Sequence, residues 1–216
     1  MSPREKILDR IRMQSGRRAP FHVRMDDVSA HLKARAVSPR PFIDGDLRTR
    51  FVAMAGRLSM TCAQVAQSSQ VPAAIAAYLN DHGLPHAAVC WPEFASLDWA
   101  GSGVSIEARA ARESDLVGIT GAFCAIAETG TLMTLSGPET PPAVSLLVET
   151  HIAIVRAARI VPCMEEAWAL LRAEHMVMPR AVNFISGPSR TADIEQTMVL
   201  GAHGPYRVHV ILVHAE

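Results

Sequence analysis

Leu116-Val117-Gly118-Ile119-Thr120, followed by Gly121, is the stretch of this 216-residue sequence that decides its fold class. The run is short, carries no charge and ends at a glycine, which is typical of a strand buried on both faces of a parallel sheet. Similar apolar runs recur along the chain, and we predict a strand at each of them: 87–91, 104–106, 131–135, 145–148, 151–155, 182–185 and 208–213. A sheet of such strands needs helices on both faces to bury it.

Segments of helical periodicity alternate with these runs. Apolar residues recur at spacings of three and four in 47–58, in 72–83 and in 164–171. We therefore predict an α/β fold with three layers, α/β/α. The sequence contains no G-x-G-x-x-G or G-x-x-x-x-G-K-S/T loop, which disfavours a dinucleotide site or a P-loop nucleotide site.

A separate helix is predicted at the amino end, where Ser2 and Glu5 have the spacing of a capping box. Residues 17–44 follow with weak periodicity and scattered proline, arginine and aspartate. We predict an N-terminal helix and arm over residues 1–45 and a compact α/β domain over residues 46–216.

The composition excludes several classes of partner. Lysine and arginine total 21 residues and aspartate and glutamate total 21, so no net charge attracts the chain to nucleic acid or to an anionic membrane surface. No apolar run reaches the roughly 20 residues of a membrane span. The amino terminus lacks the hydrophobic segment of a secretory signal, so we expect a cytoplasmic protein. The four cysteines lie far apart, and we expect no metal and no cofactor in this chain.

The first candidate site lies at 185–195, where an apolar strand turns through Gly187 and enters a pattern predicted to be a helix capped by Thr191. Its polar candidates share this one turn: Ser186, Ser189, Arg190, Thr191 and Asp193. Hydroxyls, a guanidinium and the N–H groups of a helix start can hold a carboxylate or a phosphate at the carboxyl end of a strand. Asp193 can instead hydrogen-bond substrate hydroxyls, and the alternative to a site is simply a capped helix after a tight turn.

The second candidate is Glu128, which apolar residues precede and which the turn Thr129-Gly130-Thr131 follows. Burial raises the pKa of a carboxyl group and suits it to proton transfer, and a well-placed carboxylate can also attack an acyl group. The alternative is a structural clamp in which Glu128 accepts hydrogen bonds from Thr129, Thr131 or nearby N–H groups.

The third candidate is the loop 201–205, in which glycines and a proline present His203 beside Gly204. His203 can titrate near neutral pH, although a histidine in a tight turn is more often structural. A metal site built from Glu128, His151 and His203 lacks any local ligand spacing, and we do not predict one.

Taken in order, 115–120, 125–131, 151–152, 186–195 and 201–205 resemble the LUD-domain family. The resemblance implies a fold of the NagB/RpiA/CoA-transferase-like kind, shared by glucosamine-phosphate deaminases, ribose-phosphate isomerases and CoA transferases. It also implies a place in the oxidation of L-lactate to pyruvate, in which partner proteins carry the iron-sulfur clusters.

On this resemblance we expect Glu128 and His203 to be the catalytic residues. The expected substrate-binding residues come from the same motifs: Thr120, Thr129, Gly130, Thr131, Ser186, Gly187, Ser189, Arg190, Thr191, Asp193 and Gly204. The expected partners are a small carboxylate and the iron-sulfur lactate utilization proteins, with a homo-oligomer as a further option.

Two other functions remain open at this point. A self-sufficient enzyme of the same fold would act on a phosphosugar, an acyl-CoA or a folate-like ligand, with Glu128 as nucleophile or base and His203 as its partner. A pure interaction scaffold would leave the site without a ligand.

Overall fold

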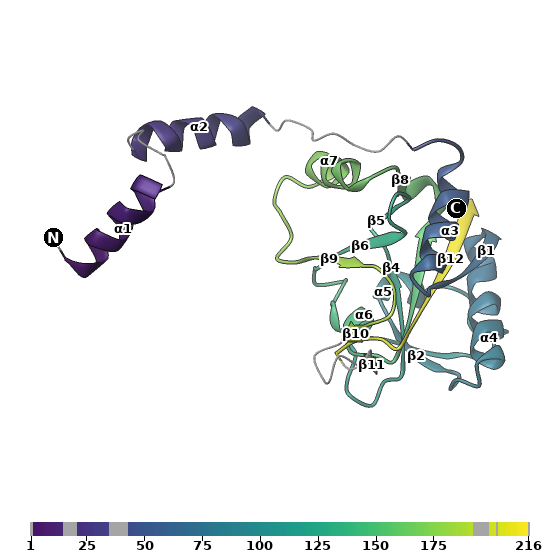
Figure 1. The fold of residues 1–216 in the computed structure, drawn as a ribbon. Helices are drawn as coiled ribbons and strands as arrows, with labels where there is room; N and C mark the ends of the chain where they lie inside the picture. Colours follow the sequence, from purple (N-terminus) through teal and green to yellow (C-terminus); the bar gives the residue numbers. More distant parts are fainter. Residues whose placement is uncertain (1, 15–20, 35–42, 192–198, 202, 216) are drawn as a thin grey trace. The chain divides into compact units, whose positions relative to one another are not determined.

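In the computed structural model the chain divides into two compact units, Met1–Phe42 and Ile43–Glu216. The structure describes residues 2–14, 21–34, 43–191, 199–201 and 203–215. The larger unit holds two sheets and the helices that pack on them (Figure 1).

The smaller unit consists of helix α1 (Pro3–Gln14) and helix α2 (Phe21–Ala34). The predicted capping box is confirmed, because the Ser2 N–H donates to Glu5 Oε2 (2.6 Å) and the Glu5 N–H donates to Ser2 Oγ (3.2 Å). Helix α2 was not predicted from the sequence.

The central sheet of the larger unit is parallel throughout, with the strand order β1-β12-β7-β4-β2-β3. Its strands are β1 (Thr61–Gln67), β2 (Ala87–Cys90), β3 (Ser105–Ala108), β4 (Val117–Gly121), β7 (Thr150–Arg156) and β12 (Arg207–Ala215). Val117 pairs with Thr150, and Thr150 pairs with Arg207, so three of these strands begin level with one another. The sheet therefore has one clear amino edge and one clear carboxyl edge.

A second sheet has the order β8-β5-β6-β9. It contains β5 (Cys124–Ile126), β6 (Thr131–Leu135), β8 (Ile160–Val161) and β9 (Val182–Ile185). Strands β5 and β6 form a hairpin around the turn that carries Glu128. A two-stranded hairpin, β10 (Arg190–Thr191) with β11 (Val199–Leu200), lies further along the chain.

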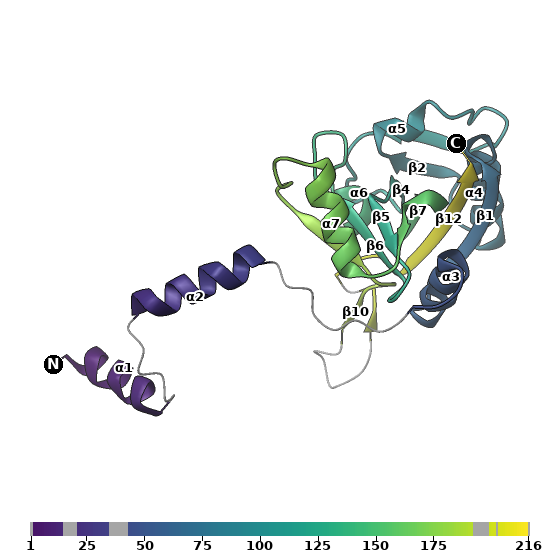
Figure 2. The same ribbon diagram turned by 90° about the horizontal axis from the view of Figure 1, so that it is seen from above.

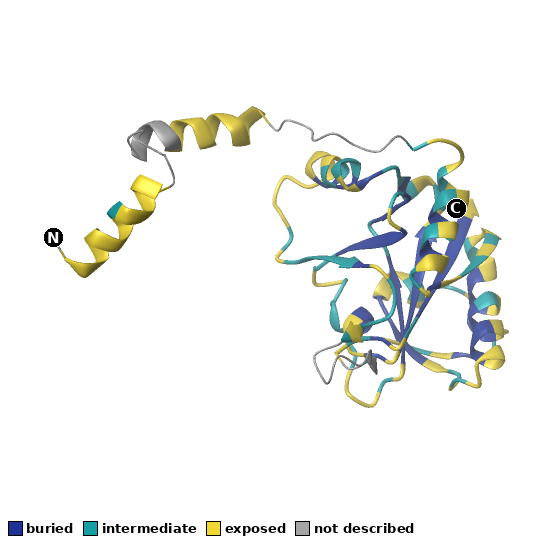
Figure 3. Ribbon diagram, viewed as in Figure 1, coloured by how far each residue is buried: buried dark blue, intermediate teal, exposed yellow. Residues whose placement is uncertain are grey.

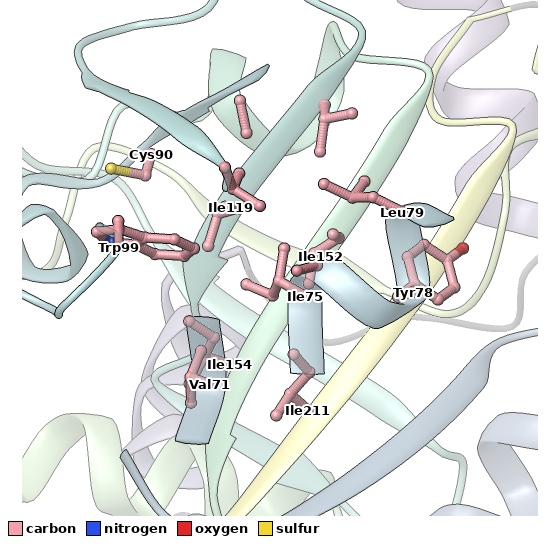
Figure 4. Close-up of a cluster of buried hydrophobic side chains, with 14 of the residues drawn as sticks. Val71, Ile75, Tyr78, Leu79, Cys90, Trp99, Ile119, Ile152, Ile154 and Ile211 are labelled. Atoms are coloured by element: carbon pink, nitrogen blue, oxygen red, sulfur yellow. The ribbon is translucent and has the colours of Figure 1, made fainter. Parts of the chain in front are cut away.

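The core forms on both faces of the central sheet, which Figure 3 shows as mostly dark blue strands. Alternate residues of β7 face opposite ways: Ile152 packs with helix α4 (Val71–Asp81), whereas Ala153 packs with helix α3 (Leu47–Arg57) and with the second sheet. Figure 4 shows the α4 side of this core. Helix α7 (Met164–Glu174) covers the outer face of the second sheet. The predicted α/β fold is confirmed, and helices flank the sheets when the molecule is viewed from above (Figure 2).

One predicted strand is wrong. The segment 145–148 is not a strand, because helix α6 (Ala143–Leu146) begins after Pro142 and ends within it. A Cβ at Gly118 would overlap the Val144 carbonyl, so the helix packs directly on the backbone of β4. Short apolar runs of this kind do not distinguish a strand from a buried helical turn.

The remaining described elements are short. They are η1 (Ser68–Gln70), α5 (Pro92–Ala95) and η2 (Ala157–Arg159). No helix in the described part of the chain combines the length and the apolar character that crossing a membrane requires.

Candidate functional site

The turns that carry the first two sequence motifs lie side by side. Strands β6 and β9 are antiparallel with Leu132 opposite Ile185, which brings Thr131 next to Ser186. The Thr131 and Ser186 hydroxyl oxygens are 2.7 Å apart, and the Thr129 hydroxyl donates to Thr131 Oγ1 at 2.8 Å. A chain of three hydroxyls therefore links the Glu128 turn to the Ser186 turn.

The end of helix α3 packs against both turns. Gly130 has a φ of +66°, and a Cβ there would lie 2.6 Å from the Met54 carbonyl carbon. Gly187 has a φ of +99°, and a Cβ there would overlap the Leu58 carbonyl oxygen. Only glycine permits both the left-handed backbone and this close approach, so both residues shape the site through their backbone.

Ser59 supplies a contact that the sequence did not reveal. It follows helix α3 with a φ of 64°, and the Met60 N–H donates to the Ala55 carbonyl at 3.0 Å, which is the pattern of a Schellman cap. The Ser59 hydroxyl accepts a hydrogen bond of 2.6 Å from Nη2 of Arg190. The helix end thereby holds the guanidinium next to the two turns.

The third motif joins the same region through Ser189. The Ser189 N–H donates to the Pro205 carbonyl, and the Gly201 N–H donates to the Ser189 carbonyl, each at 2.9 Å. A Cβ at Gly204 would lie 3.2 Å from that of Ser189. The three motifs thus form one continuous region, and the loop 201–205 places it at the amino edge of the central sheet, just before β12.

His203 is exposed on this loop and lines a cavity of about 630 Å³. Glu149, Tyr206 and Arg207 line the same cavity, with the Arg207 guanidinium 4.8 Å from the centre of the Tyr206 ring. The cavity is open and polar, and it offers both signs of charge beside the motif region.

Glu128 is partly exposed at the start of its turn. Its N–H donates to the Pro162 carbonyl at 2.9 Å, which extends the pairing of β5 with β8. The Thr129 hydroxyl donates to Thr131 and so does not clamp the Glu128 carboxylate. Glu128 therefore stands at the start of the turn that carries the hydroxyl chain, with its side chain partly exposed.

Thr120 lies apart from this region. It is fully buried in β4, and its hydroxyl is 2.7 Å from Nε2 of His151, which is also fully buried. Burial lowers the pKa of His151 to about 4, so the ring is neutral in the folded protein near neutral pH. Among the described residues, Glu128, His151 and His203 do not form a group of potential metal ligands.

The predicted helix cap at Thr191 is wrong, because Thr191 pairs with Val199 in the β10–β11 hairpin. Asp193 lies outside the described residues, as does the rest of the predicted first helical turn. Arg190 belongs to the same hairpin strand and is exposed.

Potential metal ligands come together elsewhere, at the start of helix α7. The ligand atoms of Cys163, Glu165 and Glu166 all lie within 4.8 Å of one another. The Cys163 thiol donates to a carboxylate oxygen of Glu165 at 2.8 Å and also to Glu166. The group is thus held as a hydrogen-bonded cluster at the start of helix α7.

The geometry suits the binding of a small anion. Arg190 offers a guanidinium that is bound to Ser59 at the end of helix α3. The turns that carry the paired Thr131 and Ser186 hydroxyls pack against the same helix end. A carboxylate prefers this combination of charge-assisted and neutral donors.

Comparison with known proteins identifies close sequence relatives. The family model described as the LUD domain matches residues 52–213. Lactate utilization protein C of Exiguobacterium sp. is 43% identical over 101 residues, covering 45% of this chain and 44% of that protein. Lactate utilization protein C of Bacillus licheniformis is 35% identical over 127 residues, covering 57% and 53%. The protein of the same name from Bacillus subtilis is 43% identical over 100 residues, covering 45% and 42%. The matched part thus spans about half the length of these curated relatives.

A solved structure shares the fold. The crystal structure of a DUF162 family protein from Deinococcus radiodurans aligns with a TM-score of 0.58 and 22% identity, covering 80% of this chain and 99% of that chain. At this identity the likeness concerns the fold alone.

Proposed function

The chain belongs to the LUD-domain family, and from this membership we propose that it serves lactate utilization by binding a small carboxylate, L-lactate or pyruvate. The name of the matched relatives supports the pathway, and the donor set around Arg190 supports the class of ligand.

The observation that carries the proposal is the Ser59–Arg190 hydrogen bond beside the Thr131–Ser186 contact. A guanidinium has five N–H donors, so it can hold a carboxylate through two of them while keeping its bond to Ser59. Because the bond fixes the guanidinium before the ligand arrives, less side-chain entropy is lost on binding.

Glu128 and His203 are the acidic residue and the histidine that the structure describes within the three motifs. Oxidation of L-lactate to pyruvate removes two electrons and two protons. In the proposed reaction the Glu128 carboxylate accepts the proton of the substrate hydroxyl, the His203 imidazole accepts the proton of the C2–H bond, and the electron pair of that bond passes to an acceptor. Both roles require a side chain that the substrate can reach, and both residues are at least partly exposed.

The two electrons require an acceptor, and in this proposal iron-sulfur partner proteins receive them. The chain itself contributes substrate binding and proton transfer. An assay of the reaction therefore needs the purified chain and the iron-sulfur partner proteins together.

The first test is thermal unfolding of the full-length protein with L-lactate, pyruvate, a phosphosugar, an acyl-CoA and a folate. A ligand at 100 times its Kd stabilises the native state by about 2.7 kcal/mol. We expect L-lactate or pyruvate to raise the Tm, and Arg190→Met to abolish the effect. Arg172→Met, which changes an exposed arginine on helix α7, is the matched control and keeps it. Stabilisation by a phosphosugar, an acyl-CoA or a folate instead would favour a stand-alone enzyme of this fold.

The second test separates binding from proton transfer. Glu128→Gln keeps the shape of the side chain but removes the base. We expect this variant to bind pyruvate as the wild type does and to lower lactate oxidation at least 100-fold when the iron-sulfur partners are present. Unchanged oxidation would show that Glu128 is not the base.

A further inference from the structure

A second cavity, of about 620 Å³, lies at the opposite, carboxyl edge of the central sheet. From β2 the chain crosses to its neighbour β3 on one side, whereas β4 connects towards β7 on the other side. The connections that leave the ends of β2 and β4 therefore diverge. Crevices at such switch points of parallel sheets are the usual ligand sites of open α/β folds.

The walls of this cavity are largely apolar. Helix α5 follows β2 directly and lies beside it (Figure 2), contributing Phe94, while Phe123 follows the end of β4. Val71 and Ile154, both drawn in Figure 4, line the cavity from the main core. A volume and lining of this kind suit a ligand larger than lactate with an apolar or aromatic body.

Two arginines line the cavity. Arg159 donates two hydrogen bonds to the Glu174 carboxylate (2.6 and 2.9 Å) and one to the Phe123 carbonyl (2.9 Å). Its guanidinium also lies 4.6 Å from the centre of the Phe123 ring, so Arg159 stabilises this side of the cavity. Arg156 lies at the carboxyl end of β7 and brings a second positive charge to the cavity.

Glu93 is the acidic group that opposes Arg156. A Cβ at Gly121 would lie 2.8 Å from Oε1 of Glu93, so the missing side chain at the end of β4 makes room for the carboxyl group. Partial burial raises the pKa of Glu93, and the positive charge of Arg156 works against that rise. The two residues therefore interact electrostatically across the cavity.

We propose that this cavity binds an organic anion with an apolar or aromatic body, whose anionic group is held by Arg156 while the body lies against Phe94 and Phe123. Glu93 competes with the ligand for the positive charge of Arg156. The site is separate from the proposed lactate site, and no residue is shared between them.

The test uses a matched pair of fluorescent probes. 8-Anilino-1-naphthalenesulfonate carries a sulfonate, and N-phenyl-1-naphthylamine is its uncharged counterpart. We expect the sulfonate probe to bind the full-length folded protein at one saturable site. Arg156→Met should weaken its binding at least tenfold and Glu93→Gln should strengthen it several-fold, whereas binding of the uncharged probe should stay the same in Arg156→Met.

Two controls cover other sites of probe binding. Val177→Ser removes an exposed apolar side chain of the loop after helix α7, and Arg190→Met removes the charge of the proposed lactate site. Neither should change the affinity for the sulfonate probe. The proposal is overturned if Arg156→Met and Glu93→Gln leave this affinity unchanged, or if Val177→Ser abolishes binding. Stabilisation by pyruvate is expected to persist in Arg156→Met, so the two proposals can fail independently.

Discussion

At the scale of single residues, Ser59 links backbone geometry to the proposed chemistry. A non-glycine residue at a φ of 64° is strained, and here it ends helix α3 and places its hydroxyl on Arg190. Glycine would remove the strain and the hydroxyl together, whereas alanine would keep the strain and lose only the hydroxyl. This pair of substitutions therefore separates stability from binding.

We predict that Ser59→Gly leaves the free energy of unfolding within about 1 kcal/mol of the wild type, because relief of backbone strain offsets the lost hydrogen bond. Ser59→Ala should be less stable than Ser59→Gly by about 1 kcal/mol. Both variants should bind pyruvate equally weakly. Denaturant unfolding and calorimetric titration measure the two effects, and normal pyruvate binding by either variant would contradict the role assigned to Ser59.

Two buried histidines predict an acid-sensitive stability. Burial lowers the pKa of His151 to about 4, and burial together with the charge of His82 lowers that of His209 to about 4. In the unfolded chain a histidine has a pKa near 6.5, so the unfolded state binds more protons between these values. The contribution of these two histidines to the free energy of unfolding is therefore fully present above about pH 6.5 and is lost as the pH falls towards 4. The loss is about 2 kcal/mol per histidine between pH 7 and pH 5.

Denaturant unfolding at a series of pH values measures this effect. In His209→Gln the free energy of unfolding should depend less steeply on pH, because only one of the two histidines still contributes. If the free energy of unfolding of this variant fell equally steeply with decreasing pH, His209 would not contribute to the pH dependence.

At the scale of elements, the junction of helix α3 with the two turns organises the candidate site. The approach of the helix end to Gly130 and Gly187 sets the spacing of Ser59, Thr131 and Ser186. The helix itself was predicted from its apolar spacing and is confirmed. The junction was not predictable, because Ser59 and Arg190 are separated by 131 positions and nothing in either local sequence indicates the contact.

Gly130→Ala is predicted to be strongly destabilising. The new Cβ would lie 2.5 Å from the Ala55 backbone nitrogen, and the φ of +66° disfavours any side chain. We expect a loss of about 2–3 kcal/mol in the free energy of unfolding. Gly101→Ala is the matched control, since nothing lies within 4 Å of its added Cβ, and it should be close to neutral. A Gly130→Ala protein as stable as this control would contradict the packing described at the junction.

The strands and helices differ in how far the sequence alone predicts them. Strands buried on both faces, such as β4 and β7, were predicted because nearly every residue of the run is apolar or small, His151 being the exception in the run 151–155 of β7. Strand β1 was missed because it lies at the sheet edge and most of its exposed positions carry polar residues. Helix α2 did leave a signal, since Met25, Val28 and Leu32 recur at spacings of three and four.

At the scale of the whole molecule, the fold presents two distinct edges of one parallel sheet. The three sequence motifs gather near the amino edge, and the cavity with Arg156 and Glu93 opens at the carboxyl edge. The motifs were recognisable in the sequence because each is a turn with glycine and polar residues. The second cavity was not, because its lining comes from the ends of several separate strands and from single residues without a local pattern.

The central claim is that the corner formed by Ser59, Ser186 and Arg190 binds a small carboxylate. Calorimetric titration of the full-length protein with pyruvate and with L-lactate tests it most directly, using wild type, Arg190→Met and Arg156→Met. We expect one binding site in the wild type, no measurable binding by Arg190→Met and unchanged binding by Arg156→Met. Binding that survives in Arg190→Met and disappears in Arg156→Met would contradict the claim and move the carboxylate to the opposite edge of the sheet.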